Sequence, residues 1–262
     1  KSLQSSVRFH PAFGVVFLLL YASFRLFISF AKPIHSVKLI TTVDPDIVLV
    51  NIGDTDRAGI GKLLLAIDSS QPVLIAVDVL FFGSKGPVQD SVFSNALETT
   101  RNDILAYNLD SLGKPVEVQD QFRAFITDQG LMKFERVHYL VSRTKPVRVI
   151  DDDIYEDLAL KIVKLWKPGF SHRIKKNMSI PIEFRRLLQS FMVFDGIDIN
   201  DVDPEFLKNK IVLVGYIGPS DGDKFYTPIR LLKYYPPDVP DTYGLVILAN
   251  EIRTILGYEV KD

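Results

Sequence analysis

The stretch IVLVNIGDTDRAGIGKLLLAIDSS, residues 47–70, decides the fold of this chain. It opens with a continuous apolar run over residues 47–52, rich in Ile and Val, which is typical of a strand covered on both faces. From Arg57 to about Ser69 the pattern becomes that of a helix. A strand followed closely by a helix is the unit from which parallel sheets are built.

The same alternation continues along the chain. A second apolar run covers residues 73–79, a helix is predicted over residues 90–100 with Asp90 as its N-cap, and a third strand candidate covers residues 103–107. Strands that alternate with helices over short loops imply parallel pairing. We therefore expect an α/β fold with a mainly parallel central sheet and flanking helices.

The remaining sequence is less regular and adds further elements. A helix is expected from Asp153, where Glu156 completes a pattern that resembles a capping box. The other predicted elements are a strand over residues 137–142, short strands within 180–184 and 191–194, a buried strand over 210–215, and a final helix over 243–256 that ends at Gly257.

Composition excludes several classes of function. The 262 residues carry 31 basic and 32 acidic side chains, so the net charge of −1 gives no footprint for nucleic acid and no polybasic patch for lipid. The chain has no cysteine, which excludes disulfides, thiolate metal sites and a cysteine nucleophile. Its four histidines do not pair at helical spacing, so a helical histidine metal site is not expected.

One segment is apolar enough for a membrane. Residues 11–31 contain a single charge, Arg25, and a helix of that length spans about 30 Å, the thickness of a bilayer core. We expect a transmembrane helix there, after a tail over residues 1–10 and before a linker over residues 32–46. The alternatives are a buried core helix and a cleaved signal segment, although no clear cleavage site follows.

Four carboxylates are candidates for a ligand or metal site. Asp54 and Asp78 each follow a buried strand, and the carboxyl ends of parallel strands meet at one edge of a sheet. If Asp90 and Asp223 reach the same edge, the four could hold a divalent cation such as Ca²⁺ or Mg²⁺. The alternative is that they cap helices and fix loops, since Asp54 and Asp90 both precede predicted helices.

Two polar residues nearer the C-terminus are further candidates. Thr227, held extended by Pro228, could bind a ligand or stabilise a turn, and Asn250 on the final helix could reach the same edge or lie on the surface. The triplet Asp54-Thr55-Asp56 also permits a metal-dependent phosphatase of the haloacid dehalogenase type. Ala58 stands where that motif usually has Thr, which weakens this alternative.

Several strings resemble the second class of cyclase/histidine-kinase-associated sensory extracellular domains, here called CHASE-two. The strings are IVLVNIGDTDRAGIG (47–61), IAVDVLF (75–81), KNKIVLVGYIG (208–218), DKFYTP (223–228) and YGLVILANEI (243–252). Two positions depart from the family pattern, because Gly53 replaces an Asp and Leu248 replaces a His. A site that uses those positions in other members would be altered here.

The resemblance implies a sensory, ligand-binding domain over residues 47–257, with residues 258–262 leading out. It implies a non-enzymatic part of a bacterial signalling protein of the inner membrane, with this domain periplasmic or extracellular and in a homodimer or with other membrane subunits. The small-molecule ligand is not indicated. The alternative is a structural or scaffold subunit of a membrane complex that kept the fold and lost the ligand.

Overall fold

The computed structural model describes residues 39–137, 139–228, 240 and 242–260. The predicted transmembrane segment, residues 11–31, lies outside these residues. Within the part that is described, no helix has the length and apolar character needed to span a bilayer.

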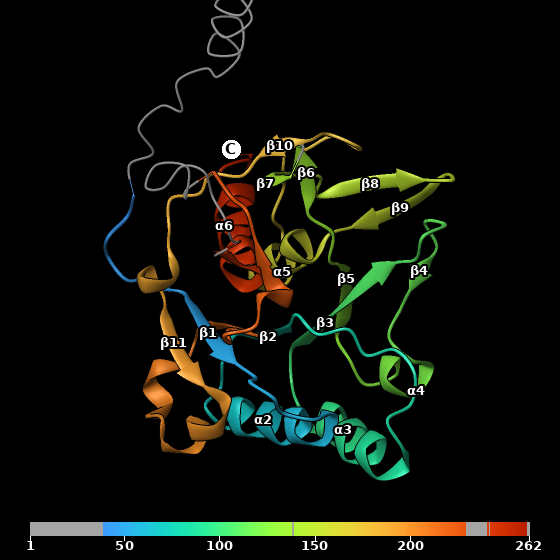
Figure 1. The fold of residues 1–262 in the computed structure, drawn as a ribbon, viewed down its shortest axis with the longest axis vertical. Helices are drawn as coiled ribbons and strands as arrows, with labels where there is room; N and C mark the ends of the chain where they lie inside the picture. Colours follow the sequence, from blue (N-terminus) through green and yellow to red (C-terminus); the bar gives the residue numbers. More distant parts are fainter. Residues whose placement is uncertain (1–38, 138, 229–239, 241, 261–262) are drawn as a thin grey trace, which may run out of the picture. The chain divides into compact units, whose positions relative to one another are not determined.

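A six-stranded parallel sheet forms the centre of the domain (Figure 1). Its order is β11-β1-β12-β2-β3-β5, and the short β4 pairs antiparallel with the end of β3. The bounds are β1 (Ile47–Asn51), β2 (Leu74–Val77), β3 (Asp103–Leu109), β4 (Pro115–Val116), β5 (Asp128–Leu131), β11 (Met192–Asp195) and β12 (Ile211–Gly215). The expected parallel sheet is therefore confirmed, and β12 lies between β1 and β2 although it comes much later in the chain.

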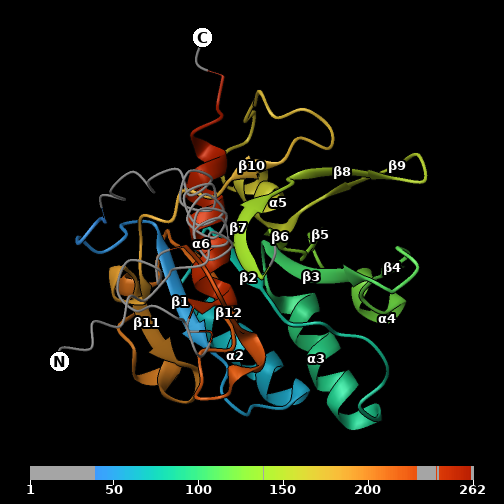
Figure 2. The same ribbon diagram turned by 45° about the horizontal axis from the view of Figure 1, so that its top comes forward.

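Helices cover both faces of this sheet (Figures 1 and 2). The helices are α2 (Arg57–Ser69), α3 (Pro87–Thr99), α5 (Leu158–Trp166) and α6 (Gly244–Leu256). Because side chains alternate along a strand, Val48 and Val50 pack with the α2–α3 pair, whereas Ile47 and Leu49 pack with α5 and α6. Continuous apolar runs are needed in such strands, since neither face meets water.

Smaller elements surround this three-layer body. They are α4 (Asp120–Arg123), β6 (Glu135–Val137), β7 (Leu140–Thr144), β8 (Val147–Ile150), β9 (Asp153–Glu156), β10 (Ile180–Pro181), η1 (Leu188–Ser190), η2 (Gly196–Asp201), η3 (Pro204–Phe206), η4 (Asp221–Asp223), β13 (Lys224–Phe225) and β14 (Thr242–Tyr243). Strands β8 and β9 form an antiparallel hairpin, and β13 pairs with β14 just before α6.

Two predicted helix starts are wrong. The segment from Asp153 is strand β9, and α5 begins later because Asp157 is its N-cap and accepts the N–H of Leu160 at 3.1 Å. Helix α3 begins at Pro87, so Asp90 lies in its first turn and is not the N-cap. A proline at the first helical position starts a helix without losing a hydrogen bond.

The segment that leads into β1 belongs to the folded body. Residues 39–46, which the sequence assigns to the linker and which we call the lead-in, run beside residues 185–190. The N–H of Ile40 donates to Arg185 O at 2.8 Å, and that of Asp44 donates to Ser190 O at 2.8 Å. The lead-in is therefore part of the folded domain.

Candidate functional site

The connections that leave the central strands define where a ligand could bind. The chain passes from β1 to α2 on one face of the sheet, whereas after β12 it passes to α6 on the other face. Neighbouring strands whose connections diverge in this way open a crevice at their carboxyl ends, the usual ligand position in α/β sheets. We call this edge the rim, and it comprises residues 51–54, Asp78 and residues 216–227.

Asp78 occupies the rim directly after β2. Its backbone N–H donates to Val214 O at 2.8 Å, which fixes its position beside β12. Its partly buried carboxyl forms no hydrogen bond or ion pair with the residues that the structure describes. Burial, with a smaller contribution from the charge of Asp223, raises the pKa of Asp78 to about 7. A carboxyl without a donor at a crevice can accept a proton or a cationic ligand.

Asp223 lies beside Asp78 and contacts the start of α6. Its carboxyl accepts the backbone N–H of Gly244, the first residue of that helix, while burial raises the pKa of Asp223 to about 6. A Cβ on Gly244 would lie 3.0 Å from a carboxyl oxygen of Asp223, so the close approach favours glycine there. Any change at Asp223 therefore acts on the N-terminus of α6, where a carboxylate is favoured by the helix dipole.

Several contacts hold the rim loop against the start of α6. The hydroxyls of Thr227 and Thr242 lie 2.9 Å apart, and the Tyr243 hydroxyl donates to Gly218 O at 3.1 Å. Lys224 donates to Asp221 at 3.1 Å. Thr227 is only 1% exposed, so its hydroxyl stabilises the β13–β14 junction rather than facing solvent.

Asp54 is on the rim but lies apart from Asp78. It is exposed, and it borders a hollow of about 410 Å³ at the ends of β1 and β11. The cap of α2 is Asp56, which accepts the N–H of Gly59 at 2.8 Å, so the predicted capping role belongs to Asp56 rather than Asp54. Strand β12 separates the two strand ends that carry Asp54 and Asp78.

Asp90 serves a different purpose on the α2–α3 face. It forms a buried ion pair with Arg57 and accepts a hydrogen bond from the Ser84 hydroxyl. The Ser84 bond, followed by the bond from Arg57, holds the pKa of Asp90 below its usual range. Arg57 also lies over the rings of Phe81 and Phe122. This arrangement joins two helices and a loop.

Asn250 is buried on α6 and does not face the rim. Its carbonyl oxygen accepts the N–H groups of Arg185 and Arg186, both at 3.1 Å. Its amide nitrogen donates to Arg186 O at 3.0 Å and to Val246 O at 2.8 Å. With all these groups satisfied, Asn250 fixes the segment that runs beside the lead-in, and both roles suggested by the sequence are replaced by a structural one.

The predicted four-carboxylate cation site is not assembled. Within the described ranges, no group of three or more His, Cys, Asp or Glu side chains is placed to hold a metal ion. Of the four candidates, only Asp78 and Asp223 come together. A divalent ion would therefore have two protein carboxylates at most from this set, a number typical of a heavily hydrated Mg²⁺.

A second feature, missed in the sequence, is an ion-pair cluster that joins α6 to the lead-in. Asp44 is fully buried, and its carboxylate is bound by Arg253 of α6 and by Arg186 at 2.9 Å. The N–H groups of Asp46 and Ile47 also donate to it, each at 3.0 Å. Residues 44 and 253 are 209 positions apart, so no local pattern could indicate this contact.

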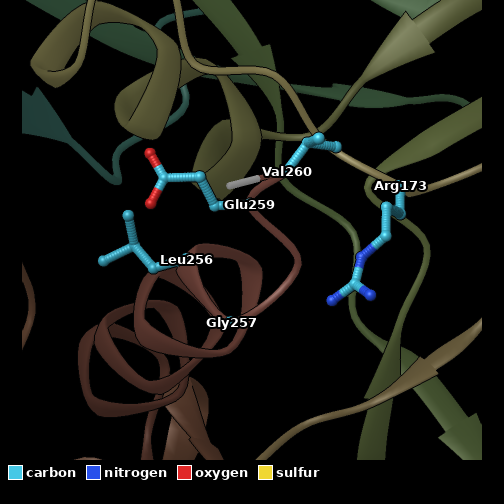
Figure 3. A pocket seen from close by; sticks show the side chains of 5 residues that line it. All are labelled: Arg173, Leu256, Gly257, Glu259 and Val260. Atoms are coloured by element: carbon cyan, nitrogen blue, oxygen red, sulfur yellow. The ribbon is translucent and has the colours of Figure 1, made fainter. Parts of the chain in front are cut away.

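The C-terminal end of α6 borders a hollow of about 510 Å³ (Figure 3). It forms where residues 258–260 run along residues 171–173, with the Arg173 N–H donating to Tyr258 O at 3.0 Å. Figure 3 shows the side chains of Arg173 and Glu259 pointing to different sides of it. These charged groups do not converge on one point, so we assign no ligand to this hollow.

Comparison with known proteins now identifies the family. The sequence model of the CHASE2 domain matches residues 15–261. The chain belongs to the CHASE2 domain family. CHASE2 domains are extracellular sensory domains, generally without enzymatic activity, so this chain has the fold of a sensor. No curated protein and no solved structure is significantly similar to it.

The family assignment gives meaning to the two departures noted in the sequence. Leu248, at the position of the family's His, is fully buried against the sheet in the α5–α6 core. Gly53, in place of an Asp, has a φ of +55° at the turn after β1. Neither position offers a polar side chain to a ligand. At the rim of this CHASE2 domain, the two carboxyls that lie beside each other are those of Asp78 and Asp223.

Proposed function

We propose that this chain is the extracytoplasmic sensory domain of a bacterial membrane signalling protein and that its stimulus acts at Asp78 and Asp223. The observation that supports this most is the carboxyl of Asp78, which lacks a partner among the described residues and lies beside a carboxyl that binds α6. The family supports the sensory part. The membrane part follows from the apolar residues 11–31.

The ligand that suits the rim is a small cation. Both carboxyls have raised pKa values because burial disfavours their charged forms, and a positive charge would restore the ionised state. A primary ammonium group can donate three hydrogen bonds and could bridge the two carboxylates. Hydrated Mg²⁺ is an inorganic cation that could likewise be bound by the two carboxylates.

Helix α6 would carry the signal from the rim. Its 13 residues span about 20 Å at about 1.5 Å per residue. Asp223 binds its first N–H, and Arg253 in its last turn binds Asp44 of the lead-in. A ligand that binds two positions of α6 unequally would shift the population between them and so move the lead-in.

Thermal unfolding of the full 262-residue chain in detergent micelles tests the ligand. The probes are MgCl₂, CaCl₂ and ethylenediamine. Each is measured at one pH below about 7, where Asp78 is protonated, and at one pH above it, where Asp78 is ionised. A probe at about 100 times its Kd should stabilise the fold by about 2.7 kcal/mol and raise the midpoint by several degrees. Asp78→Asn should abolish the shift, whereas the matched control Asp54→Asn should retain it.

If no probe shifts wild-type unfolding, a small cation at the rim is excluded. If Asp54→Asn abolishes the shift instead, the ligand occupies the hollow beside β1 and β11. A shift with MgCl₂ alone would identify an inorganic ion, and a shift with ethylenediamine alone would identify an organic amine.

A scaffold role is the second candidate function, and two observations favour it. Leu248 is packed in the core where the family has His, and Asn250 is fully occupied by the protein backbone. A scaffold that has lost its ligand would show no shift with any probe, yet would copurify with fixed stoichiometry as a homodimer or with other membrane subunits. No observation favours the phosphatase, since Asp56 caps α2.

A further inference from the structure

Helix α6 carries a buried carboxyl that the rim does not use. Glu251 is 3% exposed where α6 lies near α5, and within the described part of the chain its Oε1 has no hydrogen-bond partner. Helices α5 and α6 pack on the same face of the sheet (Figure 2). Buried ionised carboxylates normally have donors, so this position suits a neutral, protonated side chain.

A second buried carboxyl faces Glu251 and already has its donors. Asp157, the N-cap of α5, accepts the N–H of Leu160 at one oxygen, 3.1 Å, and the hydroxyl of Thr144 at the other, 2.9 Å. Thr144 also lies within hydrogen-bonding reach of Glu251. Thr144 has a single hydroxyl proton, which it donates to Asp157, so it cannot also donate to Glu251 at the same time. A bond from Thr144 would favour the ionised form of Glu251, whereas burial and the charges of Asp157 and Asp78 favour the protonated form.

The other charged groups around the pair are few and come from three elements. The positive charge of Arg148, on β8, lowers the pKa of both carboxyls. Its guanidinium is bound to Glu135 and to Lys133 O, and its Nε has no partner among the described residues. The negative charge of Asp78, after β2, raises the pKa of Glu251. That of Glu156, on β9, raises the pKa of Asp157, so both charges favour the protonated forms.

Ionisation of both carboxyls would therefore place two like charges in a buried interface. Burial raises the pKa of Asp157 to about 6 and that of Glu251 well above its ordinary value, and the charge of Asp157 raises the pKa of Glu251 further. We propose that Glu251, Thr144 and Asp157 form a proton-operated switch that holds α6 against α5 while Glu251 is protonated and releases α6 when the proton is lost.

This switch would act on the same helix that joins the rim to the lead-in. Its biological meaning as a pH response rests on the proposed sensory function, whereas the switch itself rests only on the α5–α6 contacts. Failure of every cation probe at the rim would leave it standing. Conversely, a pH-insensitive α6 would leave a cation-binding rim unaffected, so the two proposals fail separately.

The chain supplies its own reporter for the experiment. Trp166, its single tryptophan, ends α5, and the guanidinium of Arg253 on α6 lies 5.7 Å from the centre of its ring. Tryptophan emission of the full chain is followed from about pH 5 to about pH 9, with circular dichroism confirming that the chain stays folded. Wild type should show an emission transition whose midpoint lies above that of an ordinary glutamate.

Two variants and one control decide the assignment. Glu251→Gln keeps the neutral shape and should lose the transition. Asp157→Asn keeps a side chain that can cap α5 and should move the midpoint to lower pH, because one like charge is gone. Asp103→Asn removes another buried carboxyl, on β3, and should leave the transition unchanged.

The absence of a transition in folded wild-type protein would overturn the proposal. So would a transition that persists in Glu251→Gln, since the titrating group would then lie elsewhere. If Glu251→Gln does not fold, the Asp157→Asn midpoint decides the matter, and an unshifted midpoint counts against the switch.

Discussion

Asp44 and Arg253 join the segment that leads into the sheet to the last turn of the final helix. The Arg253 Nε donates to Asp44 Oδ2 at 2.9 Å, and a second nitrogen of the same guanidinium bonds to Oδ1. Asp44 is fully buried. The planar guanidinium of arginine suits such two-point binding to a carboxylate. Through this pair the last turn of α6 is held to the lead-in.

Replacing Asp44 should destabilise the fold strongly. Asp44→Asn leaves the largely buried guanidinium of Arg186 without its anion and leaves Arg253 paired with Asp46 alone. Loss of one partner of a buried pair typically costs about 3–5 kcal/mol. For a domain of this size that corresponds to a fall in Tm of about 10 °C, measured by thermal unfolding of the full chain.

The matched control for that measurement is an exposed ion pair. Arg101, whose side chain is 64% exposed, pairs with Asp68 at 3.2 Å. Arg101→Ala should change the free energy of unfolding by about 1 kcal/mol or less. Equal effects of Asp44→Asn and Arg101→Ala would mean that the buried Asp44–Arg253 pair stabilises the fold no more than an exposed ion pair does.

Asn250 provides a second test of how firmly α6 holds its neighbours. Asn250→Asp keeps the shape but replaces a donor by an acceptor, so the carbonyl oxygens of Arg186 and Val246 each lose the hydrogen bond from this side chain. We expect a loss of about 2–4 kcal/mol in denaturant unfolding at neutral pH. The exposed Asn95 on α3 is the control, and Asn95→Asp should be nearly neutral. A small effect at Asn250 would argue against its structural role.

Buried carboxyls should make the domain most stable in mild acid. The pKa of Asp78 is raised to about 7, and those of Asp103, Asp157 and Asp223 to about 6. Burial is the first cause in each case, so the folded state binds these protons more tightly than the unfolded state. Their contribution is complete below about pH 4 and is lost as the pH rises through about 6 to 7.

Asp103 allows a quantitative check of that trend. It is fully buried, it accepts the N–H of Thr127 at 3.1 Å, and its other oxygen has no partner among the described residues. Asp103→Asn should reduce the fall in unfolding free energy between about pH 4 and about pH 8 by about 2 kcal/mol. Urea unfolding at both pH values measures it, and an unchanged fall would contradict the assignment.

The bonded carboxyls work in the opposite direction. Glu135 has its pKa held below the usual range by Arg148 and Lys145, despite partial burial that would raise it. Its contribution is present above the ordinary pKa and is lost as the pH falls. The unfolding free energy should therefore decline on both sides of a maximum in mild acid, rather than increase steadily as pH is lowered.

The sequence predicted the central sheet well because each of its main strands has a recognisable local pattern. The apolar runs at β1, β2 and β12 are continuous, since both faces of each strand are covered, and α2 was predicted with its observed bounds. The start of α5 was predicted wrongly, because residues 153–156 match a capping box while their pairing with β8 decides the structure. That pairing is not visible in a local pattern.

The candidate site could be predicted only in part, and for the same reason. The positions of Asp54 and Asp78 after buried strands indicated a shared edge that Asp223 could reach, and the structure brings Asp223 beside Asp78 but leaves Asp54 apart. Asp90 pairs instead with Arg57, and Asn250 with residues 185–186, through contacts between distant segments. The Asp44–Arg253 link and the Glu251–Asp157 pair also join distant segments, so neither could be found from spacing.

The central claim is that the rim and the lead-in communicate through α6, and amide hydrogen exchange tests it most directly. Asp223→Ala removes the acceptor of the Gly244 N–H at the start of α6. The full chain should then exchange the amides of Asp46 and Ile47, which donate to Asp44, faster than wild type, while amides in β3 stay protected. Asp54→Ala, a rim carboxylate away from α6, should leave them unchanged. Unaltered exchange at Asp46 and Ile47 in Asp223→Ala would contradict the account.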